Sequence, residues 1–114
     1  MLKGLGQIGD MAKMMKQAQE VQAKMTEAHE GLEHLNVVGE AGAGMVKVEA
    51  NAKGDILGVT IDPALMDSEQ KDVLEDLILA GVKDAQARGR AAAQDAIAKV
   101  TEELGLPAGM KLPF

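Results

Sequence analysis

A heptad repeat near the start of the chain is the feature that most constrains its fold. Apolar or small residues recur at alternating spacings of three and four through residues 11–35, and the positions between them are almost all polar. Side chains three and four apart share one face of a helix, so the pattern predicts a long amphipathic helix with a narrow seam. Such a seam suits a second helix lying along it, as in a coiled coil. The seam residues are Met11, Met14, Ala18, Val21, Met25, Ala28, Leu32 and Leu35.

The residues before and after this helix differ from it in pattern. Residues 1–9 contain three glycines and are expected to form a flexible lead-in, with Asp10 capping the helix. Residues 37–39 are β-prone, residues 45–50 alternate with period two, and residues 56–62 form a further strand that Pro63 ends. In the last strand, Leu57, Val59 and Ile61 are expected on one face. The turn at residues 51–55 contains Gly54, so the sequence predicts a three-stranded antiparallel meander over 37–62.

A second long helix is predicted over residues 68–104. Asp67 fits its N-cap, with Gln70 completing a capping box, and Gly105 stops it. In its first half, a wide apolar stripe is expected to face both the sheet and a second subunit. In its second half, Gly89 and several alanines favour close approach of the heptad seam, and a kink at Gly81 or Gly89 is left open. Residues 105–114 are predicted to form an extended tail.

Together these elements predict one α+β domain over residues 1–114, with the order α-β-β-β-α and both helices packed on a small antiparallel sheet. The core is built from Ala, Met, Leu and Val, and Phe114 is the single aromatic residue, so such a chain gains much from dimerising. Cysteine is absent, which excludes disulfides, a thiol nucleophile and cysteine metal sites. No apolar run approaches the ~18 residues of a membrane span, so we expect a cytoplasmic protein without membrane contact.

The charge distribution indicates more about partners than the net charge of −6 does. Residues 1–25 carry four lysines against two acids, and residues 85–114 carry four cations against three acids. Residues 26–84 carry four lysines against thirteen acids and are therefore acidic overall. If the two helices pack antiparallel, both chain ends project to one tip. The mildly basic ends would then lie together, away from an acidic base.

From residue 37 onward the chain resembles the YbaB/EbfC family of bacterial nucleoid-associated proteins, and its Met-rich first helix with Met14 and Met15 fits that family's N-terminus. No single motif is specific, but the order and spacing of the motifs together are. The matching pieces are Val37-Val38-Gly39, Gly44-Met45-Val46-Lys47-Val48, the turn with Gly54, Val59-Thr60-Ile61-Asp62-Pro63, Leu74-Glu75-Asp76-Leu77-Ile78, Asp84-Ala85 and Leu106-Pro107-Ala108-Gly109-Met110.

This resemblance implies an intertwined homodimer with projecting helical arms and non-enzymatic binding of duplex DNA in the nucleoid. The family has no crisp binding signature, so the candidate contacts come from the charges on the helices. By helical geometry, Lys13 and Lys24 lie within about 20° of each other. The candidate DNA-binding residues are Lys3, Lys13, Lys16, Lys24, Arg88, Arg90 and Lys99. The candidate dimer and core residues are Met11, Met14, Val21, Met25, Leu32, Leu74, Leu77 and Ile78.

Other interpretations of the same residues stay open. The cations could be solubilising surface charges, and the acids of residues 62–76 fit a solvated helix start better than a metal site. His29 and His34 lie about 140° apart on a helix, so they cannot share one metal ligand face. No catalytic set, cofactor or small-molecule substrate is predicted. The alternative function is an acidic protein-interaction adaptor for replication or recombination proteins, with incidental DNA contact.

Overall fold

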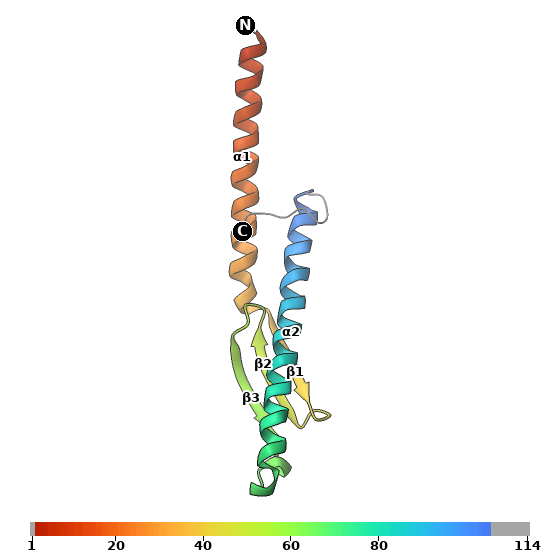
Figure 1. Ribbon diagram of the computed structural model, residues 1–114. Coiled ribbons are helices and arrows are strands. Elements are labelled where there is room, and N and C mark those ends of the chain that lie inside the picture. The colour runs from red at the N-terminus through yellow and green to blue at the C-terminus, as the bar shows by residue number, and fades with distance from the viewer. Residues whose placement is uncertain (1, 106–114) are drawn as a thin grey trace. The chain divides into compact units, whose positions relative to one another are not determined.

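The computed structural model describes residues 2–105, with side chains from Gly9 onward, and has the element order α-β-β-β-α (Figure 1). The helices and strands are α1 (Leu2–Gly31), β1 (Asn36–Ala41), β2 (Val46–Asn51), β3 (Ile56–Ile61) and α2 (Lys71–Glu103). Short 3-10 turns occupy Leu32–His34, Pro63–Leu65 and Ser68–Gln70. The predicted α+β class is therefore confirmed. The chain divides into two compact units, Met1–Glu30 with Ile97–Phe114, and Gly31–Ala96.

The first helix begins earlier than the sequence pattern indicated. It starts at Leu2, so residues 2–9 are helical and Asp10 lies within the helix instead of capping it. Once a helix is nucleated, each further residue adds a hydrogen bond, and a glycine costs only about 1 kcal/mol relative to alanine. Three spaced glycines are therefore too few to stop it. At the other end, the α-helix finishes at Gly31 and tightens into the 3-10 turn before Leu35.

The heptad seam is covered only in its second half. Met25 and Leu32 are buried, with 1% and 7% of their surface exposed, whereas Met11 and Met14 are 63% and 68% exposed. Val21 lies between these extremes. Met11 and Met14 are therefore not part of a core within one protomer, and their role in a contact between protomers stays a prediction.

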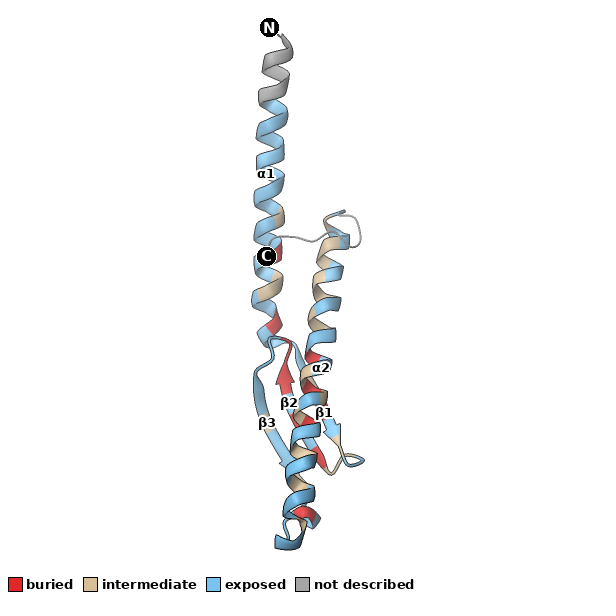
Figure 2. Cartoon of the chain, in the orientation of Figure 1, coloured by how far each residue is buried: buried red, intermediate tan, exposed pale blue. Residues whose placement is uncertain are grey.

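The three strands form one antiparallel sheet in the order β1-β2-β3. The central strand supplies the core, because Val46, Val48 and Ala50 are fully buried and alternate residues of a strand share one face. Figure 2 shows buried stretches along β2. A bulge between Glu49 and Ala50 pairs Ala50 with Ile56, so Ile56 shares the core face. Of the residues expected on one face, Val59 and Ile61 lie opposite Val48 and Val46, whereas Leu57 is the extra residue of the bulge and has no partner on β2.

The helix α2 packs on the sheet through small residues one turn apart. Gly81, Ala85 and Gly89 are all buried, and a Cβ added at Gly39 of β1 would lie 2.3 Å from the Ala85 nitrogen. α2 continues as α-helix through both glycines, so neither breaks it. A Cβ at Gly89 would lie 2.9 Å from the Asn51 carbonyl oxygen. Gly89 therefore allows α2 to approach the sheet, whereas approach of the heptad seam was expected there.

Other parts of α2 agree closely with the prediction from the sequence. Its α-helical part begins at Lys71, three residues later than predicted, because Ser68–Gln70 form a 3-10 turn. The Asp67 side chain caps that turn by accepting from the Glu69 N–H at 3.1 Å. The predicted core residues Leu74, Leu77 and Ile78 are half-buried against the cluster around Val46 and Val48. The predicted tail and shared basic tip involve Met1 and residues 106–114, which lie outside the described residues.

The hairpin between β2 and β3 is organised by one buried amide. Asn51 is 3% exposed, and its Oδ1 accepts from the backbone N–H groups of Lys53 and Asp55 at 3.0 and 3.1 Å. Its Nδ2 donates to the Glu33 carbonyl oxygen at 3.2 Å and to Asp55 Oδ2 at 3.1 Å. This side chain therefore closes the predicted turn and ties it to the segment that follows α1.

The loop between β1 and β2 carries the one non-glycine residue with positive φ in the described chain. Gly42, Ala43 and Gly44 have φ values of 61°, 56° and 87°, and Met45 donates its N–H to the Gly42 carbonyl at 3.1 Å. A residue with a Cβ costs roughly 1–2 kcal/mol in this left-handed region, while glycine adopts it freely. Ala43 therefore stores backbone strain at the tip of the loop.

Ala43→Gly is expected to stabilise the protein by about 0.5–1 kcal/mol, because relief of left-handed strain exceeds the added entropy of the unfolded chain. Urea unfolding at a fixed protein concentration measures this change. Ala91→Gly is the matched control, since Ala91 is an exposed residue inside α2. There the same substitution should cost about 1 kcal/mol. Equal effects at both positions would contradict a strained Ala43.

Candidate nucleic-acid interface

Two of the α1 lysines, Lys13 and Lys16, lie on the side of the helix away from the heptad seam, and Lys24 flanks the seam. At about 100° per residue, Lys13, Lys16 and Lys24 fall within about 80° of one another, with Lys16 opposite the middle of the seam and Lys24 about 80° from it. All three side chains are exposed. Among the side chains described from Gly9 to Gly105, they form no ion pair. Coverage of the seam would therefore leave the ammonium groups of Lys13 and Lys16 directed into solvent.

The lysine side of α1 is not purely basic. Glu20 lies about 40° from both Lys16 and Lys24 on the helix, and Glu27 also falls within this strip. Glu20 is exposed and forms none of the ion pairs found in the described part of the chain. On this side of α1, phosphates can therefore be attracted only where the lysine side chains extend beyond the neighbouring glutamates. Such an arrangement favours contacts with a nucleic-acid backbone over binding of an anion in a deep pocket.

The cations of α2 differ from one another in their surroundings. Arg88 Nε donates to Asp84 Oδ2 at 3.0 Å, and the same oxygen accepts from the Glu40 backbone N–H at 2.9 Å. Asp84 thus links α2 to β1 and holds Arg88. Arg90 is exposed and, within the described residues, has no ion-pair partner. Arg88 therefore presents its guanidinium in a fixed position, whereas Arg90 is free.

The surroundings of Asp84 favour its charged form. The Glu40 N–H and then the Arg88 guanidinium hold the pKa of this carboxyl below its ordinary value of 3.8. A depressed pKa in the folded state contributes stability above the unfolded pKa, and that contribution is lost as pH falls through the folded pKa. The sequence shows only that Asp84 and Arg88 are four residues apart on a helix. The hydrogen bond from the Glu40 backbone N–H to Asp84 could not be predicted from it.

Asp84→Ala is expected to lower the urea midpoint most at neutral pH. The difference from wild type should shrink as pH falls below about 3.8 and the wild-type carboxylate becomes protonated. Midpoints measured in parallel at pH 7 and under acid test this. Asp95→Ala, which removes an exposed acid from the same helix, should show no comparable trend. A pH-independent difference for Asp84→Ala would indicate that its packing, not its charge, matters.

The predicted cations are divided between the two units. Lys13, Lys16, Lys24 and Lys99 belong to the unit that contains α1, while Arg88 and Arg90 belong to the unit that contains the sheet. Lys99 is exposed, and the side chain of Lys3 lies outside the described ones. The assignment of all seven residues to DNA contact stays a prediction.

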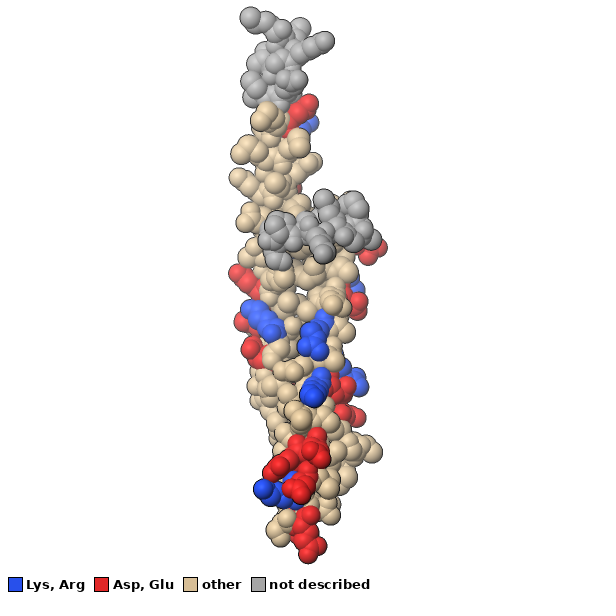
Figure 3. Space-filling model, viewed as in Figure 1, with Lys and Arg blue, Asp and Glu red and all other residues tan. Residues whose placement is uncertain are grey.

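The acidic residues around the start of α2 have structural roles. Asp62 accepts from the Ala64 N–H at 2.9 Å and Asp67 from the Glu69 N–H, so both cap short turns. Figure 3 shows acidic side chains gathered around the first turns of α2. Within residues 9–105, no cluster of three or more histidine or acidic side chains could hold a metal ion. His34 Nε2 lies 3.2 Å from Oε1 of its neighbour Glu33.

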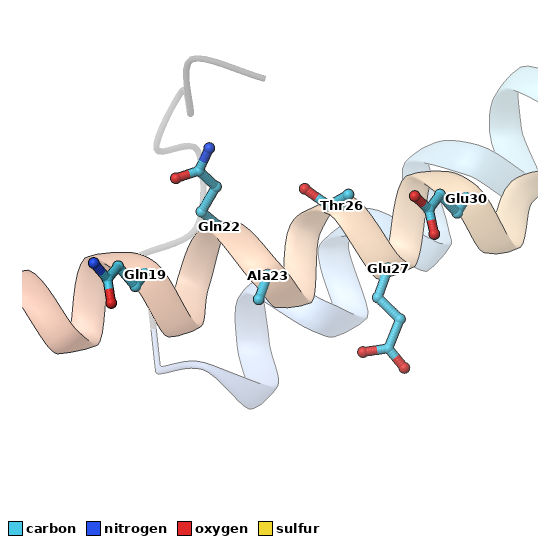
Figure 4. A pocket seen from close by; sticks show the side chains of 6 residues that line it. All are labelled: Gln19, Gln22, Ala23, Thr26, Glu27 and Glu30. Atoms are coloured by element: carbon cyan, nitrogen blue, oxygen red, sulfur yellow. The ribbon is translucent and has the colours of Figure 1, made fainter.

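A shallow polar depression runs along α1. Figure 4 shows that its lining side chains all come from this one helix and point in different directions, and the depression of about 440 Å³ is largely open to solvent. It is therefore an open helix face and offers no enclosed ligand site. In the described part of the chain, no helix is both long enough and apolar enough to cross a membrane. The lining residues are Gln19, Gln22, Ala23, Thr26, Glu27 and Glu30.

Comparison with known proteins decides the family. A sequence profile of the YbaB/EbfC DNA-binding family matches residues 7–104. The chain belongs to the YbaB/EbfC family. The resemblance, which already included the Met-rich first helix, is thereby confirmed over residues 7–104. Membership places the chain in a family of DNA-binding proteins and not of enzymes.

Curated relatives of this YbaB/EbfC protein support the same assignment. It is 46% identical to a nucleoid-associated protein of Maricaulis maris, 49% identical to one of Granulibacter bethesdensis and 44% identical to one of Agrobacterium fabrum. Each match spans 105 residues, which is 92% of this chain and 98% of the relative. An uncharacterized protein of Helicobacter pylori shares the fold, with a TM-score of 0.62 at 17% identity, covering 74% of this chain and 88% of that one.

Proposed function

We propose that this YbaB/EbfC protein is a nucleoid-associated protein that binds duplex DNA as a homodimer with little sequence specificity and alters DNA conformation or compaction. Effects on gene expression would follow from that change. The proposal places the protein in the nucleoid, within the cytoplasm. The observation that carries it is the row of exposed lysines along one side of α1, which form no ion pair among the described side chains, in a chain that belongs to a DNA-binding family.

The chemistry of this surface favours the duplex backbone. Lysine contacts phosphates as a point charge without reading bases, and α1 offers Lys13, Lys16 and Lys24 on one side. Single-strand binding relies on aromatic side chains that stack on bases. The only aromatic residue of the sequence is Phe114. The acids near the start of α2 would repel DNA and restrict contact to the cationic parts of the helices.

The sheet supplies the argument for a homodimer. Ile56 and Val59 pair with the fully buried Ala50 and Val48 and share their face, yet they are 41% and 45% exposed. Figure 2 shows most of β3 as exposed. On α2, Val73 and Leu79 are also 46% and 55% exposed. An apolar face that is buried at the central strand but open at its edge favours coverage by a second protomer. We therefore expect the dimer contact to include β3.

Val59→Glu is expected to reduce the native mass from twice 11.9 kDa to the mass of one chain, because a carboxylate would have to be desolvated in the apolar contact. Native mass spectrometry or sedimentation velocity measures this. Thr60→Glu is the matched control, since Thr60 pairs with Lys47 on the other face of the sheet. A dimeric Val59→Glu variant would show that the protomers meet elsewhere.

A salt titration of binding to random-sequence duplex tests the function. Neutralising Z phosphates gives a slope of log affinity against log salt near −0.9Z, so about five contacts per dimer predict a slope of about −4 to −5. Similar affinities are expected for duplexes of different sequence. A slope near zero would overturn backbone binding and favour the alternative function, an acidic adaptor for replication or recombination proteins.

A further inference from the structure

We propose that residues 10–24 of α1 form a second self-association surface, which pairs antiparallel with the same segment of another copy. The surface starts from the uncovered half of the heptad seam. Met11, Met14 and Met15 are 63%, 68% and 64% exposed, and Ala18 is exposed as well. Three large apolar side chains on one helix are an unusual amount of apolar surface to leave in water.

The heptad itself indicates the occupant. Knobs-into-holes packing requires a partner helix with the same 3-4 spacing, and residues 11–21 of a second copy provide it. In an antiparallel pair, Met11 of one copy meets Val21 of the other, and Met14 meets Ala18. Each layer then combines a long side chain with a shorter one, which fills the seam without overpacking. Val21 is half-buried in the protomer and completes the outermost layers.

Charge complementarity selects the antiparallel sense. With these core layers, the residues that flank the seam on one side are Asp10, Gln17 and Lys24, spaced seven apart. In the antiparallel pair, Asp10 of each copy meets Lys24 of the other, and Gln17 meets Gln17 across the twofold axis. A parallel pair would place Asp10 beside Met15 of the second copy, without a charge partner. The sequence is therefore self-complementary in one direction only.

This pairing leaves the outward lysines available. Lys13 and Lys16 lie on the side of the helix away from the seam, so two paired copies would present two such rows. The pairing itself does not depend on DNA binding, and it uses none of the β3 residues that we assign to the dimer. With two distinct contacts per protomer, dimers could be joined to one another.

Cysteine pairing in the full-length protein tests the arrangement, since the sequence contains no native cysteine. Single variants Met14→Cys and Ala18→Cys are mixed in equal amounts and oxidised in a glutathione buffer without DNA, and intact mass identifies each disulfide-linked dimer. Antiparallel pairing predicts that mixed dimers far exceed the one-half of random pairing. A majority of identical pairs would indicate parallel helices, and little disulfide of any kind would show that this surface is not a contact. Either outcome overturns the proposal.

A charge exchange tests the flanking pairs in the same cysteine background. Lys24→Asp alone converts two attractive pairs into two repulsive ones and is expected to reduce mixed-dimer yield roughly fivefold. Asp10→Lys added to it should restore the yield, because each pair again joins opposite charges. Lys16→Asp, which makes the same charge change on the outward side, is the matched control. Repetition with Val59→Glu separates this contact from the β3 dimer: the mixed disulfide should persist there, and its loss would contradict two independent surfaces.

Discussion

Gly39→Ala is expected to destabilise the protein by at least about 3 kcal/mol, a large part of the stability of a typical small domain. A Cβ at this position would lie 2.3 Å from the Ala85 nitrogen, 2.6 Å from its Cα and 2.7 Å from the Gly81 carbonyl oxygen. All three are backbone atoms of α2, so no side chain can rotate away. Relief requires α2 to separate from β1, which opens the core over Val46 and Val48.

Urea unfolding followed by circular dichroism measures the loss. Gly58→Ala on β3 is the matched control, because its added Cβ would meet nothing closer than Glu49 Oε2 at 4.0 Å. That variant should stay within about 1 kcal/mol of wild type. If Gly39→Ala were as stable as Gly58→Ala, the close approach of α2 to β1 would be wrong.

Reversal of four candidate cations is expected to abolish duplex binding. The variant replaces Lys13, Lys16, Arg88 and Arg90 by glutamate, which removes candidate phosphate contacts and adds repulsion. Each lost contact should flatten the salt slope by about 0.9, and affinity should fall by on the order of 100-fold or more at low salt. Fluorescence anisotropy with random duplex measures affinity, while native mass shows that the dimer persists.

The matched control reverses four other lysines, which gives the same change in net charge. Lys47, Lys53, Lys71 and Lys83 lie outside the candidate set, and Lys53 and Lys71 already pair with Glu33 and Glu75. This variant should lose much less affinity for the duplex, because it changes only the overall electrostatic potential of the protein and removes no candidate phosphate contact. Comparable losses in both variants would show that net charge, not the position of the cations, governs binding. Normal binding by the first variant would place the interface elsewhere.

The family resemblance and the order of elements could be obtained without coordinates, because each depends on local spacing. The heptad from Met11 to Leu35 and the alternation from Val46 to Ala50 are periodic, and each period belongs to one type of structure. The helix start was misplaced, since helix propagation overrides a few unfavourable glycines. The bulge at Leu57 was not predicted, because it adds one residue to β3 that the alternation of apolar residues does not reveal.

The candidate site was predictable only in part, because contacts between residues far apart in the chain leave no local pattern in the sequence. The sequence gives the cations and their angular positions on each helix. It does not give the link from Asp84 to the Glu40 N–H, which joins residues 44 apart in the chain. It also gave no indication that the seam is covered at Met25 yet open at Met11 and Met14. Coverage depends on which surfaces meet in space, and periodicity shows only which face is apolar.

By itself, then, the sequence determined two long amphipathic helices around a three-stranded meander, because hydrogen bonding and side-chain direction within a helix or strand are local. Only the tertiary structure decided the use of the small residues. Gly39 lies against Ala85, and Gly89 lies against the Asn51 carbonyl. Each glycine is compatible in isolation with a turn, a kink or a packing contact. The choice is made by the backbone that approaches it from a distant part of the chain, where a single Cβ would not fit.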